Sequence, residues 1–324
     1  MPQPPAKSRL RTWIERLAPY VITAVVVVAI LRRYPIGGIA ASMARGHVVP
    51  MIALALALAC TLLPLVSAWD SVVLRSCFPA IAYLDVLRGK AGTSVLLVLG
   101  YAFGSGGYGV WIARTTGCGA RLATGAVLYV IASDLCAVST VAIAPVWLVG
   151  FDAAAALRIA APLVATLVVL VVLVGGRVGS HDVTGPGRIF DPWRLVPPSR
   201  GLLQIAGRCF NIALIVAATW AGARVFGLDV PFGAMAIYMP VILLVGSLPV
   251  NVGVLGPVQA VWLLAFRPWA PGEQILAFQL LWQLSFGVGI VLRGLPFVRR
   301  VVAEIGDPPG QPRTALETRQ GLET

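Results

Sequence analysis

One acidic residue, Asp134, lies near the centre of a long apolar run of residues 122–148. An isolated ionised carboxylate is costly inside a hydrocarbon layer. We therefore expect Asp134 to be neutral, paired with a cation, or directed into a hydrated cavity. In a substrate path it would act as a proton relay or a counter-charge. The structural alternative is an ion pair, or a protonated acid hydrogen-bonded within a helix bundle.

A candidate partner for this acid comes from the apolar run of residues 202–222. Gln204, Arg208 and Asn211 recur there at i, i+4 and i+7, so they share one face of a helix that must point away from lipid. We expect Arg208 to approach Asp134 or a lipid phosphate, because its guanidinium offers two parallel donors. Alternatively, Arg208 snorkels to the membrane interface from near the start of its helix.

Glycine and proline interrupt two other apolar stretches, residues 100–109 (GYAFGSGGYG) and residues 249–259 (PVNVGVLGPVQ). Backbone groups released at such breaks must be satisfied at membrane depth by protein or by cavity water. A helix that begins near Pro257 would direct its N-terminal N–H groups at an anion such as a phosphate. A simple loop between two helices is the alternative.

The two interrupted stretches also suggest an internal repeat. At an offset of 147 residues, Gly106 aligns with Gly253 and Gly109 aligns with Gly256. Glycine-broken helices at corresponding places in two halves indicate an inverted repeat with a substrate site near the midplane, whereas close helix packing would also place glycines at this spacing. The candidate substrate-binding residues are Asp134, Arg208, Asn211, Gln204, Gly106, Gly109, Pro249, Asn251, Gly253, Gly256, Gln259 and Gln283.

The composition shows which elements must position these residues. Hydrophobic residues make up 58% of the 324-residue chain and charged residues only 12%, which excludes an ordinary soluble or disordered protein. Spanning helices need about 20 apolar residues. Runs near that length lie at residues 14–31, 48–69, 91–113, 122–148, 159–176, 202–222, 231–250, 252–267 and 273–296. The sequence therefore predicts an all-α polytopic membrane protein with about seven to nine transmembrane or re-entrant helices.

The chain is expected to form one membrane domain over residues 1–305, followed by a disordered tail of residues 306–324. Within it, halves at residues 14–176 and 202–300 are joined by a polar loop at 177–201. The short mixed stretches 34–45 and 70–82 are neither long nor apolar enough to span, so they are expected at the interface.

The net charge of +12 predicts an orientation. Basic residues gather before the first apolar run, in the polar loop, and after the last run at Arg293, Arg299 and Arg300. The positive-inside rule then places both termini in the cytoplasm, in a bacterial-type inner membrane. An even number of crossings follows, so at least one glycine-broken segment is expected to be re-entrant, although Arg32, Arg33 and Arg45 would lie outside.

Several chemistries find no support in the sequence. The five cysteines form no CxxC and the two histidines stand in no metal-binding motif, so no metal or cofactor is predicted. No nucleophile and base stand in a catalytic arrangement, which makes an enzyme the less favoured class. The basic residues are dispersed along membrane flanks, so nucleic acid is not an expected partner.

The order of elements resembles the membrane domain of the lysylphosphatidylglycerol synthase/flippase family over roughly residues 14–300. Two segments carry the resemblance: FGSGGYGVWIARTTGCG after the third apolar run, and a P-x-x-x-G-x-x-G-x-x-[QE] segment before the last helix. Pro249, Gly253, Gly256 and Gln259 match that late motif. Asn251, Val252 and Val254 depart from it, and Gln259 stands where the family usually has an acid. No soluble aminoacyltransferase domain is expected in this chain, so the resemblance implies a lipid-binding or lipid-translocating unit.

We thus expect a flippase-like protein whose partners are membrane lipids with anionic headgroups. One alternative is a membrane-embedded enzyme acting on lipid-linked or polyprenyl-phosphate substrates. Such enzymes usually cluster acids near a membrane face, whereas the acids near the predicted interfaces are scattered here. These scattered acids are Asp70, Asp85, Asp152, Asp229 and Glu273. A second alternative is a non-catalytic subunit of a separately encoded enzyme.

Overall fold

The computed structural model describes residues 23–98, 100–148, 189–247 and 257–306, and every regular element among them is a helix. A helix of residues Thr23–Arg33 comes first. The others, in chain order, are α2 (Ile36–Arg45), α3 (Val48–Cys77), α4 (Tyr83–Ser94), the 3-10 helix η1 (Val95–Val98), α5 (Tyr101–Thr116), α6 (Ala120–Leu148), α8 (Pro192–Leu195), α9 (Pro198–Phe226), α10 (Phe232–Ser247), α11 (Pro257–Phe266) and α12 (Gly272–Gly306).

Four of these helices, α3, α6, α9 and α12, are long and apolar enough to cross a membrane. A fifth span results if Thr23–Arg33 and α2, which meet at 75°, count as one broken span. The described residues therefore form an all-helical protein with four to five candidate membrane spans. The predicted seven to nine are not reached there, because α10 and α11 have only 16 and 10 residues and residues 91–113 are broken. The run at 159–176 lies outside the described residues.

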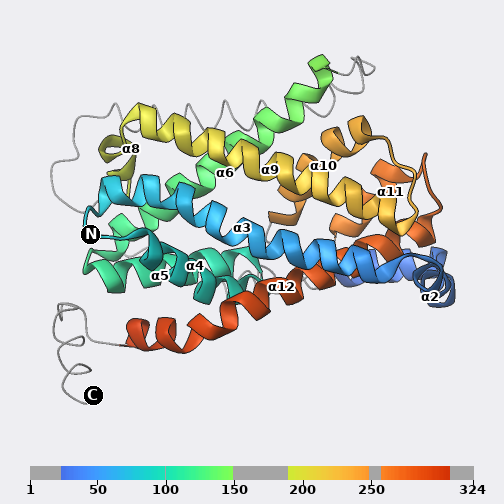
Figure 1. Cartoon of the computed structure of the whole chain (residues 1–324), viewed down its shortest axis with the longest axis horizontal. Coiled ribbons are helices and arrows are strands. Elements are labelled where there is room, and N and C mark those ends of the chain that lie inside the picture. Colours follow the sequence, from blue (N-terminus) through green and yellow to red (C-terminus); the bar gives the residue numbers. More distant parts are fainter. Residues whose placement is uncertain (1–22, 99, 149–188, 248–256, 307–324) are drawn as a thin grey trace, which may run out of the picture.

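The four long helices follow the longest axis of the molecule (Figure 1). At one end, here called the α8 end, α3 and α12 finish and α6 and α9 begin. Arg200 of α9 donates there to Ser76 of α3 over 2.9 Å, and Trp111 of α5 donates to Glu304 of α12 over 2.7 Å.

The opposite end, here called the α2 end, is where α9 finishes and α12 begins (Figure 1). Gln274, in the first turn of α12, donates there to the carbonyl of Gly227, the residue that ends α9, over 3.1 Å. The contact shows that the last residues of α9 and the first residues of α12 lie at the same end of the bundle. Because α9 ends and α12 begins at the α2 end, the chain between them, which contains α10 and α11, starts and finishes at this same end.

Two short hairpins consequently enter the bundle from opposite ends. Because α3 finishes and α6 begins at the α8 end, α4, η1 and α5 go in from that end and come back to it. The other hairpin, α10 and α11, enters from the α2 end. In the first hairpin the helix breaks at Gly100, whose φ of 146° is strained for any residue with a side chain.

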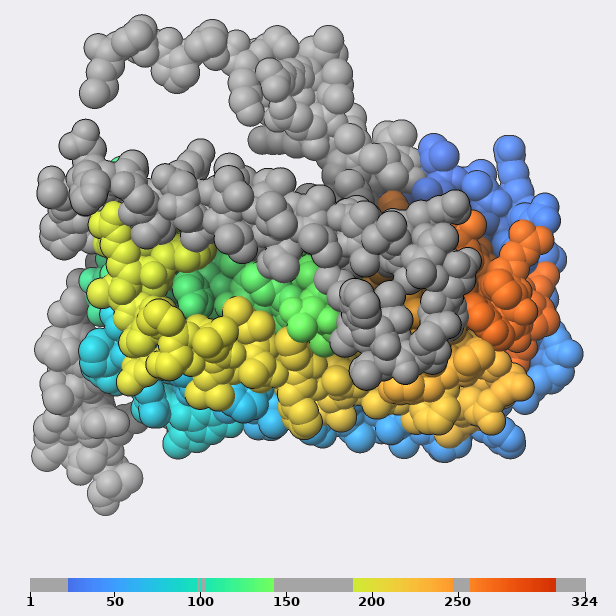
Figure 2. Space-filling view, turned by 90° about the horizontal axis from the view of Figure 1, so that it is seen from above, coloured from blue at the N-terminus to red at the C-terminus, as the bar shows by residue number. Residues whose placement is uncertain are grey.

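The helices α3 and α9 pack against each other closely enough to exclude a side chain at one point. Gly207 of α9 faces the indole ring of Trp69 in α3, and a Cβ atom at Gly207 would overlap that ring. Figure 2 shows α9 in yellow on the surface beside α3 in blue. Because Arg208 follows Gly207 and Asp70 follows Trp69, this contact brings the two charged residues together.

Three sequence expectations change with the observed helix ends. Helix α3 continues to Cys77, so residues 70–77 of the predicted interfacial stretch belong to a candidate membrane span. Arg293, predicted to follow the last helix, lies inside α12 because that helix continues to Gly306. The predicted loop at 177–201 already contains α8 and the start of α9.

Candidate functional site

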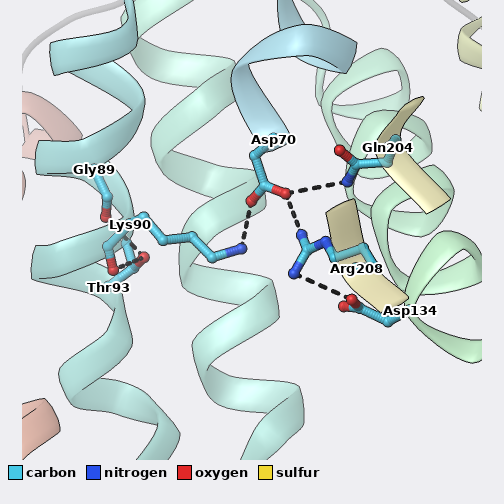
Figure 3. Close-up of polar contacts among 7 residues, drawn as sticks. All are labelled: Asp70, Gly89, Lys90, Thr93, Asp134, Gln204 and Arg208. Atoms are coloured by element: carbon cyan, nitrogen blue, oxygen red, sulfur yellow. Dashed lines mark hydrogen bonds and ion pairs between the residues drawn. The ribbon is translucent and has the colours of Figure 1, made fainter. Parts of the chain in front are cut away.

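Four charged side chains from four helices meet inside the bundle, and we call them the charge cluster (Figure 3). Asp70 comes from α3, Lys90 from α4, Asp134 from α6 and Arg208 from α9. Lys90 Nζ lies 2.5 Å from one carboxylate oxygen of Asp70, and Arg208 forms an ion pair with the other. Arg208 Nη1 also lies 3.1 Å from Asp134. A single guanidinium therefore joins both acids.

The two carboxylates differ in their surroundings. The Asp70 side chain is fully buried, whereas 31% of the Asp134 side chain is exposed. With two acids and two bases, the charge cluster is formally neutral. Asp70 is therefore an internal counter-ion, while Asp134 can exchange its contact with Arg208 for water or ligand.

Neighbouring polar groups extend the charge cluster. Gln204 lies one turn before Arg208, with Nε2 at 3.4 Å from Asp70. With its amide turned over, its oxygen accepts from Arg208 Nε at 3.2 Å, so either orientation keeps Gln204 in the network. The Lys90 ammonium lies 4.7 Å from the ring centroid of Tyr108, within the range of a cation–π contact.

Small residues around Lys90 allow α4 to approach its neighbours. A Cβ atom at Gly89 would overlap the Trp111 ring of α5. The hydroxyl of Thr93 donates to the carbonyl of Gly89 over 2.8 Å (Figure 3), so this polar group is satisfied within its own helix. The sequence GKAGTS thus supplies a tightly packed helix from which the long Lys90 side chain reaches Asp70.

Two cavities meet at Asp134. The smaller, of about 160 Å³, has a polar side formed by Lys90, Arg208 and the hydroxyl-bearing residues of α4 and α5. The larger, of about 420 Å³, is mainly apolar and lies among α3, α6, α9, α10, α11 and α12. Asp134 and Ile131 line both cavities. A ligand with a charged end and an apolar end could therefore contact both.

The face predicted on α9 meets the predicted acid on α6. The expected approach of Arg208 to Asp134 is confirmed, and Gln204 lies in the same network. Snorkelling does not describe Arg208, because only 6% of its side chain is exposed. Asn211 is buried one turn further along α9, and its amide oxygen and nitrogen have no hydrogen-bond partner in the part of the chain that the structure describes. Whether these residues bind a substrate stays a prediction.

The remaining candidates lie elsewhere. Gln283 lines the larger cavity, where it accepts a hydrogen bond from Gln279. Gln259 is buried in the first turn of α11. The break predicted within residues 100–109 occurs at Gly100, the first residue of that stretch, whereas Gly106 and Gly109 lie within the continuous helix α5. Four further candidates fall outside the described residues: Pro249, Asn251, Gly253 and Gly256.

Sequence reasoning missed Asp70 and Lys90. Asp70 was counted among the scattered interfacial acids because the apolar run before it ends at residue 69. Yet Ser67, Asp70 and Ser71 recur at i, i+3 and i+4, which is the pattern of one polar helix face. Lys90 gives no comparable signal, since it stands in a short, weakly apolar segment.

Comparison with known proteins assigns no family. No protein-family model matches the chain, and no match is found among curated proteins. Within the described ranges, no group of three or more His, Cys, Asp or Glu side chains is placed to hold a metal ion. The charge cluster and its two cavities are therefore the features from which a function can be argued.

Proposed function

We propose that this chain is a flippase-like integral membrane protein that binds an anionic phospholipid and moves it across the inner membrane. The observation that carries the proposal is the position of Asp134, which lines a polar and an apolar cavity and contacts Arg208. A phospholipid has the same division into a charged headgroup and apolar chains.

The smaller cavity suits a headgroup. At about 30 Å³ per water molecule, its volume of about 160 Å³ equals that of about five waters, which leaves space for a phosphate and part of its substituent. Lys90 and Arg208 supply the donors, and guanidinium in particular pairs with phosphate through two parallel hydrogen bonds. Asp134 occupies one of those donors until a phosphate replaces it.

The larger cavity suits part of an acyl chain. Its walls carry aliphatic and aromatic side chains such as Leu58, Val138, Ile242 and Trp262. Acyl chains gain no specific polar contact there except near Gln279 and Gln283. Such a lining accepts acyl chains of different length and unsaturation. This fits a protein that recognises the lipid headgroup and tolerates different acyl chains.

The arrangement of helices supports this class of function. Each half has a long helix, a short hairpin and another long helix: α3 to α6, and α9 to α12. The hairpins enter from opposite ends, as an inverted repeat of transporter type would have them. Counting the four hairpin helices α4, α5, α10 and α11 with the four to five candidate spans gives eight to nine membrane elements, a number within the seven to nine expected. The resemblance to the flippase family's membrane domain points the same way.

The orientation that we propose places the α8 end in the cytoplasm, together with both termini. Among the described residues, the arginines at that end outnumber those at the α2 end, as the positive-inside rule predicts for a cytoplasmic side. At the α8 end are Arg75, Arg114, Arg121, Arg194, Arg200, Arg299 and Arg300; at the α2 end are Arg32, Arg33, Arg45, Arg224 and Arg267.

Lipid exchange in proteoliposomes tests the proposal. Fluorescent phosphatidylglycerol or phosphatidylcholine is placed in both leaflets, and a membrane-impermeant reductant bleaches the outer leaflet. We expect the protein to make inner-leaflet phosphatidylglycerol accessible faster than phosphatidylcholine. Arg208→Gln should slow this by about tenfold or more, the equivalent of about 1.4 kcal/mol.

The matched control is Arg224→Gln, which removes an exposed arginine from the same helix. Its exchange rate should equal that of the unmodified protein. Equal bleaching with and without protein would reject the proposed function.

A further inference from the structure

Arg293 is an arginine inside a membrane-spanning helix. It lies in α12, and at about 1.5 Å per residue about 20 Å of helix separate it from Gly306. The exposed Arg299 and Arg300 follow it by nearly two turns. Arg293 is therefore deeper in the bundle than the arginines that mark the membrane flank.

Packing places Arg293 at the interface between α12 and α3. One turn earlier, Gly289 lies so close to Ala59 of α3 that a Cβ atom added there would be 2.7 Å from the Ala59 Cβ. Cys60, the next residue of α3, is near enough to Arg293 to interact electrostatically, and its side chain is exposed. The arginine therefore lies beside a position that membrane lipids can reach.

The guanidinium has unused donors. Its Nε and Nη1 atoms are buried and have no hydrogen-bond partner among the described residues. No acidic side chain in the described part of the chain forms an ion pair with it. It does not line the two cavities at the charge cluster either. A buried guanidinium nitrogen without an acceptor is unfavourable, and the described residues supply no acceptor to these two atoms.

We infer that Arg293 binds the phosphate group of a membrane phospholipid at the lipid-facing side of the α3–α12 interface. Phosphate is the anion that a bilayer supplies, and its oxygens match the parallel donors of a guanidinium. This site is separate from the charge cluster and does not depend on the proposed transport. Asp70 lies ten residues beyond Cys60 along α3, which is about 15 Å.

The cysteine beside Arg293 provides a local test. In a variant that keeps Cys60 and replaces Cys77, Cys118, Cys136 and Cys209 by Ala, a small fluorophore is attached to Cys60. The protein is reconstituted with brominated phosphatidylglycerol or a brominated galactolipid, which has no phosphate. We expect brominated phosphatidylglycerol to quench the fluorophore at a mole fraction several-fold lower than the brominated galactolipid requires.

Three variants identify the group responsible. Arg293→Gln should remove the preference for phosphatidylglycerol, and Arg299→Gln, which removes an exposed charge from the same helix, should leave it intact. Arg293→Lys keeps the charge without the parallel donors and should give an intermediate preference, so it serves as the test if the glutamine variant does not fold. An unchanged preference in both Arg293 variants would overturn the inference.

Native mass spectrometry of unlabelled protein gives an independent measurement. The unmodified protein should retain at least one phosphatidylglycerol molecule more than the Arg293→Gln variant does. Equal retention by the two proteins would contradict phospholipid binding at Arg293. Adding inorganic phosphate should not displace that lipid. Displacement would show that Arg293 binds free phosphate instead. Because the lipid-exchange assay depends on Arg208, failure of one proposal leaves the other intact.

Discussion

The guanidinium of Arg208 lies 3.1 Å from the carboxylate of Asp134, and it holds that acid at the boundary between a polar and an apolar cavity. The same guanidinium is anchored on its other side by Asp70, which is fully buried. One partner of Arg208 is therefore fixed and the other can be replaced. A ligand phosphate that displaces Asp134 would find the arginine already oriented.

Asp134→Asn should strengthen the binding of anionic lipid. The change removes a competing negative charge, so the net charge of the charge cluster becomes +1, and the N–H of Arg208 Nη1 is free to donate to a phosphate oxygen. We expect the affinity for phosphatidylglycerol to rise several-fold, measured by fluorescence titration in nanodiscs. Asp229→Asn, at an exposed ion pair with Arg224, should leave the affinity unchanged. An affinity that falls in Asp134→Asn would contradict this role.

Asp70→Asn should destabilise the protein. It leaves Lys90 and Arg208 without their shared buried counter-ion, and breaking a buried ion pair from one side costs about 3–5 kcal/mol. Unfolding in bicelles with increasing denaturant measures the loss. Because Asp70 and Lys90 pair directly, the double change Asp70→Asn with Lys90→Met should recover part of it. Strictly additive losses in the double variant would argue against that pairing.

Gly207→Ala tests the approach of α9 to α3. The new methyl group would overlap the Trp69 ring, so the helices must separate, and such overpacking costs about 1–3 kcal/mol. Thermal unfolding in detergent should show a lower midpoint. Gly37→Ala is the control, because a Cβ atom there meets nothing within 4 Å. If both alanine variants unfold at the same temperature as the unmodified protein, α3 and α9 do not pack as described.

Filling the larger cavity should slow lipid movement without removing the headgroup donors. Ile215 lines that cavity, so Ile215→Trp adds bulk where an acyl chain is proposed to lie. Ala213, two residues earlier on α9, is exposed, so Ala213→Trp adds the same ring on the outer face. We expect slower exchange of phosphatidylglycerol only with Ile215→Trp. Equal rates in both variants would place the acyl path elsewhere.

Sequence periodicity was sufficient for part of this site. Gln204 and Arg208 lie one turn apart on an apolar helix, so their common face and its inward direction follow from 3.6 residues per turn. Asp134 is conspicuous because it interrupts a long apolar run. The contact of Arg208 with Asp134 could be predicted from charge alone, since neither side chain is stable unpaired in that environment.

Other parts depend on tertiary structure and could not be predicted in this way. Asp70 stands at the end of an apolar run, and only the continuation of α3 to Cys77 places it inside the bundle. Lys90 reaches Asp70 because Gly89 lets α4 approach Trp111, a contact between helices that no local pattern specifies. The direction of each hairpin likewise follows from where the long helices start and finish.

The close contact of Gly207 with Trp69 also limits which parts of this molecule can move. If α9 slid along α3 by one turn, the indole ring would meet the side chain of Gln204 or Asn211, which lie on the same helix face as Gly207, and this spacing leaves no room for either. Helices α3 and α9 should thus behave as one rigid body. Any cycle of opening and closing must be carried by motion of other helices relative to this pair. Spin labels on α3 and α9 should keep a constant separation while labels on α10 move.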